Sequence, residues 1–225
     1  LAATAKADRL LNEIEEVVAM NCTAVDIAYS PNELYRLKRE GKKAIMLGIE
    51  NGYAIGKDLS RVAHFRTRGV VYMTLCHNGN NDICGSARYN EENLGVTPFG
   101  EQVIQEMNRL GMMVDLSHSG ERTFYETLDI SSQPVVCSHS SSRALCDHPR
   151  NLTDDQLRAI ARKGGVVQVC LYSGFLRKER PAHILDAIEH LNHMVNVMGI
   201  EHVGIGSDFD GDGGIIGCND SSEMI

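Results

Sequence analysis

One repeated pattern runs through the chain: a short apolar run ends in polar residues, and an amphipathic segment follows. The runs are continuous rather than alternating, which is typical of strands buried on both faces of a parallel sheet. The segments between them place apolar residues at i, i+3/i+4 and i+7, which indicates helices with one buried face. Strand and helix in alternation, with short connections, predict an α/β fold with a parallel sheet. The seven expected strands lie within residues 23–29, 43–52, 69–80, 111–118, 133–139, 164–173 and 201–211.

Local signals place the helices between these strands. Ser30 is a predicted N-cap, Pro31 then occupies the first helical position, and Gly41 follows the end of that helix. No linker or low-complexity stretch divides the pattern, so we expect a single domain over residues 1–225. The other helices are expected within residues 3–20, 98–111, 119–129, 153–165 and 181–199.

Composition narrows the function classes. A net charge of −8 argues against nucleic acid and anionic membrane surfaces as partners, because both require clustered Lys and Arg. No apolar run approaches the roughly twenty residues of a membrane span. The amphipathic start of the chain predicts no signal peptide. Seven cysteines are scattered without C-x-x-C spacing, which favours buried free thiols in a reducing compartment.

Chemistry-bearing residues stand where the apolar runs finish. In a parallel barrel the carboxyl ends of the strands all face one side, and that side holds the active site. We therefore expect these side chains to share one cavity. They are Glu50, His77, His118, His139, Tyr172 and Asp208.

Imidazole and carboxylate together are the ligand set of Zn²⁺ and similar divalent metals. A single histidine at a strand end is more often a hydrogen-bonded structural residue. His118 and His139 end consecutive strands, however, and a strand-end glutamate, Glu50, joins them, which favours a metal site. Such a carboxylate can bridge two metals, and the metal activates water for attack on a carbonyl or phosphoryl centre. His190 and His193 stand at i, i+3 on one helix and could also bind a metal, but a solvated helix face is the more typical arrangement.

The segment 204–214 carries three aspartates without the order of a calcium-binding loop. Asp208 directly follows a strand, whereas Asp210 and Asp212 lie further into the loop. Asp208 is therefore the best candidate for a general base.

Five segments in order along the chain resemble the renal (membrane) dipeptidase family, the M19 metallopeptidases of the amidohydrolase superfamily. They read GIENG, MTLCHN, VDLSHSG, CSHSSSRALCDHPRNLTDDQ and HVGIGSDFDG. The resemblance implies a (β/α)8 barrel with two zinc ions at the strand C-termini. It also implies hydrolysis of dipeptides, often with tolerance of a D-residue on the C-terminal side. By the same resemblance, Glu50 would bridge both zinc ions, and His118 and His139 would bind the second.

The resemblance also assigns groups around the substrate. His77 would polarise the scissile carbonyl, and Arg150 would pair with the substrate carboxylate, a role that suits a bidentate guanidinium. Tyr172 matches a tyrosine on the substrate side. Asp208 would take a proton from the attacking water and pass it to the leaving amine.

One departure from the family pattern concerns the first zinc. Its other two ligands come from an H-x-D pair at the end of the family's first strand, and no H-x-D occurs in these 225 residues. The resemblance thus implies an incomplete barrel that lacks the first strand and the C-terminal helices. An open sheet edge would favour pairing with another chain, such as a homo-oligomer.

Three hypotheses follow for function. The first is a zinc-dependent dipeptidase. The second is an amidohydrolase-type barrel acting on a lactone or a phosphoester, since such barrels host many reactions. The third is a catalytically impaired, truncated dipeptidase that acts by association. Arg150 favours a substrate with a free carboxylate, and therefore dipeptides.

Overall fold

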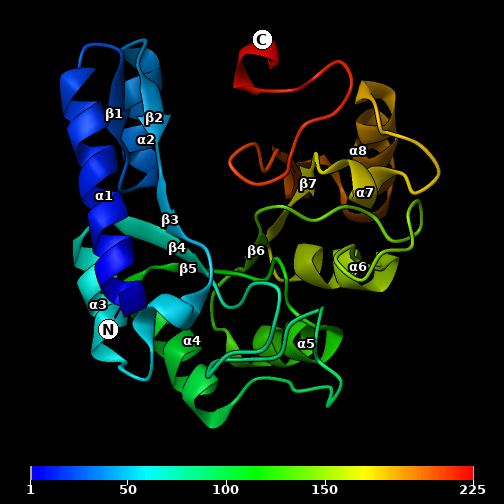
Figure 1. The fold of residues 1–225 in the computed structure, drawn as a ribbon, viewed down its shortest axis with the longest axis horizontal. Coiled ribbons are helices and arrows are strands. Elements are labelled where there is room, and N and C mark those ends of the chain that lie inside the picture. The colour runs from blue at the N-terminus through cyan, green and yellow to red at the C-terminus, as the bar shows by residue number, and fades with distance from the viewer. Residues whose placement is uncertain (1, 225) are drawn as a thin grey trace.

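The computed structural model describes residues 2–224, and its strands are all parallel. Strand β1 (Val25–Ile27) pairs with β2 (Lys43–Ile45) in a two-stranded sheet. A six-stranded sheet curls across the molecule in strict sequence order (Figure 1). Strands β1 and β8 end these sheets and do not pair with each other in the described part of the chain. The predicted α/β barrel-like class is confirmed. The six strands are β3 (Leu47–Ile49), β4 (Val70–Thr74), β5 (Met113–Asp115), β6 (Val136–Cys137), β7 (Val166–Cys170) and β8 (Val203–Gly206).

The prediction of one strand within residues 43–52 is wrong, because the run contains both β2 and β3. It breaks at Met46, and the pairing of β3 with β4 then shifts register between Leu47 and Gly48. The ring of Tyr72 lies against Gly48 so closely that a Cβ at this position would stand 2.1 Å from Tyr72 Cζ. Only glycine permits this approach, so a contact with the neighbouring strand shapes the break.

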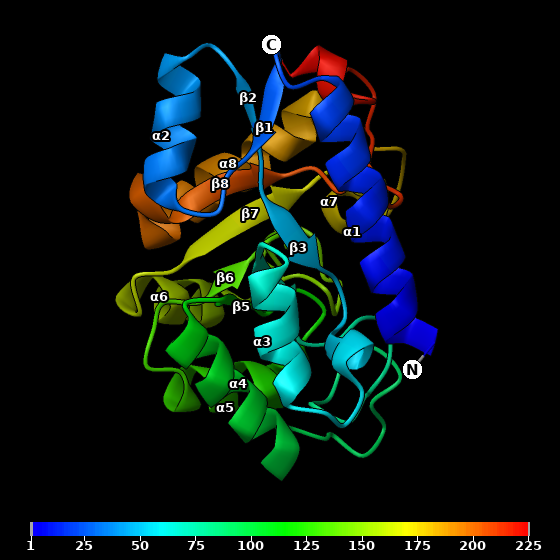
Figure 2. The ribbon, with the colours of Figure 1, turned by 90° about the vertical axis from the view of Figure 1, so that its left-hand side faces the viewer.

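Helices pack around the outside of the curled sheet, as Figure 2 shows for α3, α4 and α5. The helix that begins at Pro31 starts as its sequence signal predicts. The Ser30 hydroxyl accepts a hydrogen bond from Glu33 N, and Thr153 forms a capping box with Gln156. The helices are α1 (Ala2–Met20), α2 (Pro31–Arg39), α3 (Ser60–Thr67), α4 (Pro98–Leu110), α5 (Glu121–Ile130), α6 (Asp154–Arg162), α7 (Ser173–Leu176) and α8 (Ile184–Met198). Three 3-10 turns complete the order: η1 (Gly52–Ile55), η2 (Ile200–His202) and η3 (Ser221–Glu223).

The hydrophobic core lies between the sheet and this outer layer of helices. Fully buried side chains such as Phe65, Phe124 and Ile160 come from helices, and Val169 comes from a strand. All seven cysteines are free thiols. Six of them are buried, as the sequence predicts, and Cys22 is exposed. None of the helices within residues 2–224 has the length and apolar character to traverse a bilayer.

Candidate metal centre

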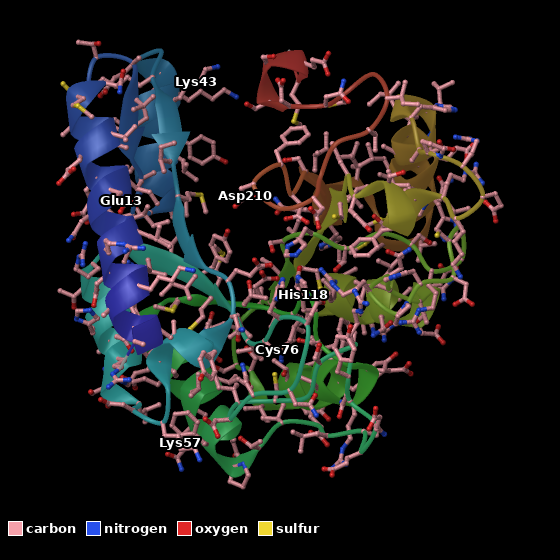
Figure 3. All side chains as sticks on the ribbon, in the orientation of Figure 1. Glu13, Lys43, Lys57, Cys76, His118 and Asp210 are labelled. Carbon is pink, nitrogen blue, oxygen red and sulfur yellow. The ribbon has the colours of Figure 1, made fainter. Side chains whose placement is uncertain are left out.

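Three of the predicted side chains meet at the carboxyl ends of the strands. Glu50 follows β3, His118 follows β5, and His139 follows β6. His118 Nε2 lies 3.1 Å from Glu50 Oε1, His139 Nε2 lies 3.3 Å from the same oxygen, and the two Nε2 atoms are 2.9 Å apart. Figure 3 shows His118 near the middle of the molecule, where the loops that follow the strands converge. These donors come from segments 21 to 89 residues apart and share one point in space.

The backbone turns sharply at several of these strand ends. His118 has φ 70° and Asp208 has φ 62°, and Asn51, directly after Glu50, has φ 77°. Residues other than glycine rarely adopt this left-handed region, and where they do, the surrounding structure holds them there. Such strain is common at functional sites.

Partners on the far side of each imidazole orient the two Nε2 atoms toward Glu50. His118 Nδ1 contacts Asn78 Oδ1 at 3.2 Å, and His139 Nδ1 contacts Ser138 Oγ at 2.8 Å. A histidine that uses Nδ1 for such a contact presents Nε2 as the atom available to a metal.

Electrostatics at this point favour a cation. Contact with the imidazoles of His118 and His139 holds the pKa of Glu50 well below its usual range, so Glu50 is a carboxylate at neutral pH. Burial lowers the pKa of His118 to about 4, so its imidazole is neutral. Tetrahedral zinc with ligands at about 2.1 Å separates its donor atoms by about 3.4 Å, close to the 2.9–3.3 Å triangle found here. The three residues therefore fit a divalent metal.

A cavity of about 280 Å³ opens beside the triad and is lined by Glu50, His139, Asp208 and Asp210, among others. Asp208 is half-buried, and burial raises the pKa of its carboxyl. Its Oδ2 lies 3.9 Å from Cys170 Sγ. Asp210 is exposed at the same cavity. Asp208 thus lies at the same cavity as Glu50 and His139.

The predicted substrate-side residues surround the triad at different distances. The ring of His77 lies 4.3 Å, between centroids, from that of His118. Arg150 is only 3% exposed, and its Nη2 donates to the carbonyl oxygen of His139 at 3.3 Å. Tyr172 lies further out: its ring packs on Phe175, which the Arg150 guanidinium also covers. His77 and Arg150 thus lie next to residues of the triad, whereas the ring of Phe175 lies between Tyr172 and Arg150.

Arg150 is a buried cation whose guanidinium makes few hydrogen bonds. Its Nε has no hydrogen-bond partner, and burial lowers the pKa of the guanidinium. A buried donor of this kind has a cost in free energy unless a ligand satisfies it.

Two polar groups behind the histidines were not singled out by sequence reasoning. Asp115 is fully buried in β5 and accepts four hydrogen bonds, two of them from Ser138, through its backbone N and its hydroxyl. The available signal was the aspartate inside the apolar run 112–116, together with a serine directly before each histidine.

The second candidate pair, His190 and His193, does not form a metal site. The expectation of a solvated face is wrong for His190, which is 1% exposed. It accepts from Ser142 N at 3.0 Å and contacts the Leu176 carbonyl at 3.3 Å, because this face of α8 packs on the chain after β6. His193 instead contacts Asp154 at 2.8 Å.

Comparison with known proteins assigns the family. The model of membrane dipeptidases (peptidase family M19) matches residues 2–224. The chain belongs to this family. Proteins with similar sequences include an uncharacterized dipeptidase of Schizosaccharomyces pombe, 44% identical over 77% of this chain and 43% of that protein. Dipeptidase 3 of Mus musculus is 34% identical over 91% of this chain and 43% of its own length. The chain thus spans less than half the length of these relatives.

Solved structures agree with the assignment to the membrane dipeptidases. The probable dipeptidase PvdM from Pseudomonas aeruginosa superposes with a TM-score of 0.91 at 28% identity, over 95% of this chain and 69% of that one. A metallopeptidase from Rhodobacter sphaeroides, solved with a phosphinate mimic of the dipeptide L-Ala-D-Ala, gives a TM-score of 0.85 at 27% identity. That superposition covers 91% of this chain and 61% of the other.

Proposed function

We propose that this chain carries the metal-binding and substrate-binding groups of a zinc-dependent dipeptidase. The convergence of Glu50, His118 and His139 on one point is the observation that carries the proposal. The names of the relatives support it, and so does the dipeptide mimic in the Rhodobacter sphaeroides metallopeptidase.

The triad holds the metal in this proposal. A bound divalent metal supplies a Lewis acid that polarises a carbonyl and lowers the pKa of water. Glu50 contacts both histidines through Oε1, which leaves Oε2 for a second cation. By the family resemblance that cation, the first zinc of the pair, would also need an H-x-D pair, which is absent from the 225 residues. Within this chain, one complete set of three donors is therefore proposed.

The remaining groups bind the substrate and move the proton. The unpartnered Nε and the fork of Arg150 bind the C-terminal carboxylate of a dipeptide, since a guanidinium pairs with a carboxylate through two hydrogen bonds. His77, beside His118, faces the scissile carbonyl. Asp208, across the cavity, accepts a proton from the attacking water and donates it to the leaving amine.

Among the alternatives, a neutral lactone leaves the buried Arg150 without a role, whereas the phosphate of a phosphoester could pair with it. A dipeptide also satisfies Arg150, and the names of the relatives and the dipeptide mimic favour it over the phosphoester. We therefore place the dipeptidase hypothesis ahead of the other two.

A hydrolysis panel tests the proposal. The protein is incubated with zinc and a set of L-X-D-Y and L-X-L-Y dipeptides, and released amino acids are quantified. Asp208→Asn is the control, because it removes the proton acceptor and leaves the triad in place. The proposal predicts turnover by the wild type and a large loss in the variant. Equal, background rates for both proteins would overturn it.

A further inference from the structure

We infer that Asp115 and Ser138 form a relay that fixes the tautomer and orientation of His139, with Nδ1 protonated and Nε2 presented to the metal. Both act as positioning residues. The inference rests on the proposed function, in which His139 is a ligand, and it assigns roles to two residues behind the triad.

Asp115 is the fixed end of the relay. It is 0% exposed, and four donors surround its carboxylate. Oδ1 accepts from Ser117 N at 3.0 Å and Ser138 N at 2.9 Å. Oδ2 accepts from Thr74 Oγ1 at 2.6 Å and Ser138 Oγ at 2.5 Å. These contacts join three neighbouring strands, so the carboxylate cannot turn away from Ser138 without breaking several of them.

The single hydroxyl proton of Ser138 is therefore committed. A serine hydroxyl has one proton to donate and two lone pairs. Its short contact with the Asp115 carboxylate uses that proton, because a carboxylate surrounded by four donors can only accept. Towards His139, 2.8 Å away, Ser138 Oγ can only accept as well. The donor in this second contact must then be His139 Nδ1–H.

The consequence lies at the other nitrogen of the ring. With Nδ1 donating to Ser138, the lone pair of Nε2 points at the triad, 3.3 Å from Glu50 Oε1. A second contact fixes the backbone of this residue, because His139 N donates to Ser117 Oγ at 3.0 Å. Hydrogen bonds of this kind behind a metal ligand typically contribute 10- to 100-fold to metal affinity.

A matched pair of serine variants isolates the relay. Ser138→Ala removes the acceptor for His139 Nδ1–H. Ser140→Ala, two residues along, removes a buried hydroxyl that has no hydrogen-bond partner. Ser138→Thr restores a hydroxyl, and the cavity that Ser138 lines has room for the added methyl group. The unfolding midpoint of each metal-free variant is measured first, so that a loss of fold is seen separately.

Zinc affinity is then measured by competition with a chromophoric chelator. The relay predicts that Ser138→Ala weakens zinc binding roughly 10- to 100-fold, that Ser140→Ala leaves it within about twofold, and that Ser138→Thr recovers most of the loss. Equal affinities of Ser138→Ala and Ser140→Ala would overturn the relay while leaving the metal site and the dipeptidase proposal intact.

Nitrogen-15 NMR of the histidine rings gives a second readout, which does not need metal. The wild type and Ser140→Ala should show a His139 Nδ1–H that exchanges slowly with water, in both metal-free and zinc-loaded protein. Ser138→Ala should lose it. If the wild type binds no zinc, the proposed function fails, and this spectrum still tests the relay. An unprotonated Nδ1 in the wild type would refute it.

Discussion

Arg150 is the residue for which stability and function are expected to change in opposite directions. It is a buried cation with one long hydrogen bond, to the His139 carbonyl, and an Nε that has no partner. Replacing it with Met, which has a similar shape and no charge, should raise the free energy of unfolding of the ligand-free protein. The same change should abolish the preference for substrates with a free carboxylate.

The magnitude follows from the contacts. Removing a buried charge recovers a desolvation cost of several kcal/mol, and removing the unpartnered Nε recovers about 1–3 kcal/mol. Against this, the variant loses the bond to the His139 carbonyl, about 1.5 kcal/mol. It also loses the stacking on Phe175, whose centroid is 5.2 Å from the guanidinium carbon, about 2 kcal/mol when desolvated. The balance favours Met by about 1–3 kcal/mol, and each kcal/mol raises Tm by about 2–4 °C in a chain of this length.

Two assays check this prediction. Urea unfolding gives the free energy of unfolding, and hydrolysis of matched dipeptides with a free or an amidated C-terminus gives kcat/KM. Loss of a buried charge-assisted pair costs about 2–5 kcal/mol. We therefore expect kcat/KM for the free carboxylate to fall about 30- to 5000-fold, with little change for the amide. Arg150→Lys keeps the charge and loses the planar fork of the guanidinium. Its kcat/KM for the free carboxylate should therefore lie between those of the wild type and Arg150→Met. A variant destabilised by more than about 1 kcal/mol, or equally impaired on both substrates, would refute the reasoning.

Three further predictions concern single side chains. Asp208→Asn should lower kcat by about 10²- to 10⁴-fold. Burial raises the pKa of Asp208, so a pH–rate profile of the wild type should show kcat/KM falling, as pH decreases, at a pH above the usual pKa of an aspartate. Arg180 and Arg177 hold the pKa of the Asp186 carboxyl well below its usual range. The contribution of Asp186 to the free energy of unfolding is therefore full at neutral pH and is lost as pH falls below about 4. Asp186→Asn should lower the free energy of unfolding by about 2 kcal/mol at pH 7, and the difference between variant and wild type, measured by urea unfolding, should narrow in acid. His118→Ala and His139→Ala should each lower zinc content in elemental analysis, and unchanged stoichiometry in both would contradict their assignment as ligands.

Much of the architecture could be predicted from local pattern. Continuous apolar runs and cap residues depend on neighbours in sequence, so the predicted strands and helices occur in their predicted order, including the Ser30 cap. The exceptions are the run that contains both β2 and β3, and helices α3 and α7, which lie outside the predicted ranges. The break between β2 and β3 could not be found in this way, because it depends on the contact of Gly48 with Tyr72, on the next strand. The burial of His190 likewise depends on which segment packs against α8.

The site residues divide in the same way, into those that local pattern predicts and those that depend on contacts between segments distant in sequence. Strand-end position alone brings Glu50, His118 and His139 together, because parallel strands deliver their ends to one face. Arg150 lies in a loop that no periodicity marks, and only the family resemblance indicated it. The relay through Asp115 was missed, since a lone aspartate in an apolar run gives no sign of which hydroxyl it will contact.

The most direct test of the metal centre is a crystal structure of the zinc-loaded protein with anomalous data at the zinc edge. The structure predicts an anomalous peak about 2.0–2.2 Å from Glu50 Oε1, His118 Nε2 and His139 Nε2. A map with zinc bound only elsewhere, or with these three side chains pointing apart, would contradict the central claim.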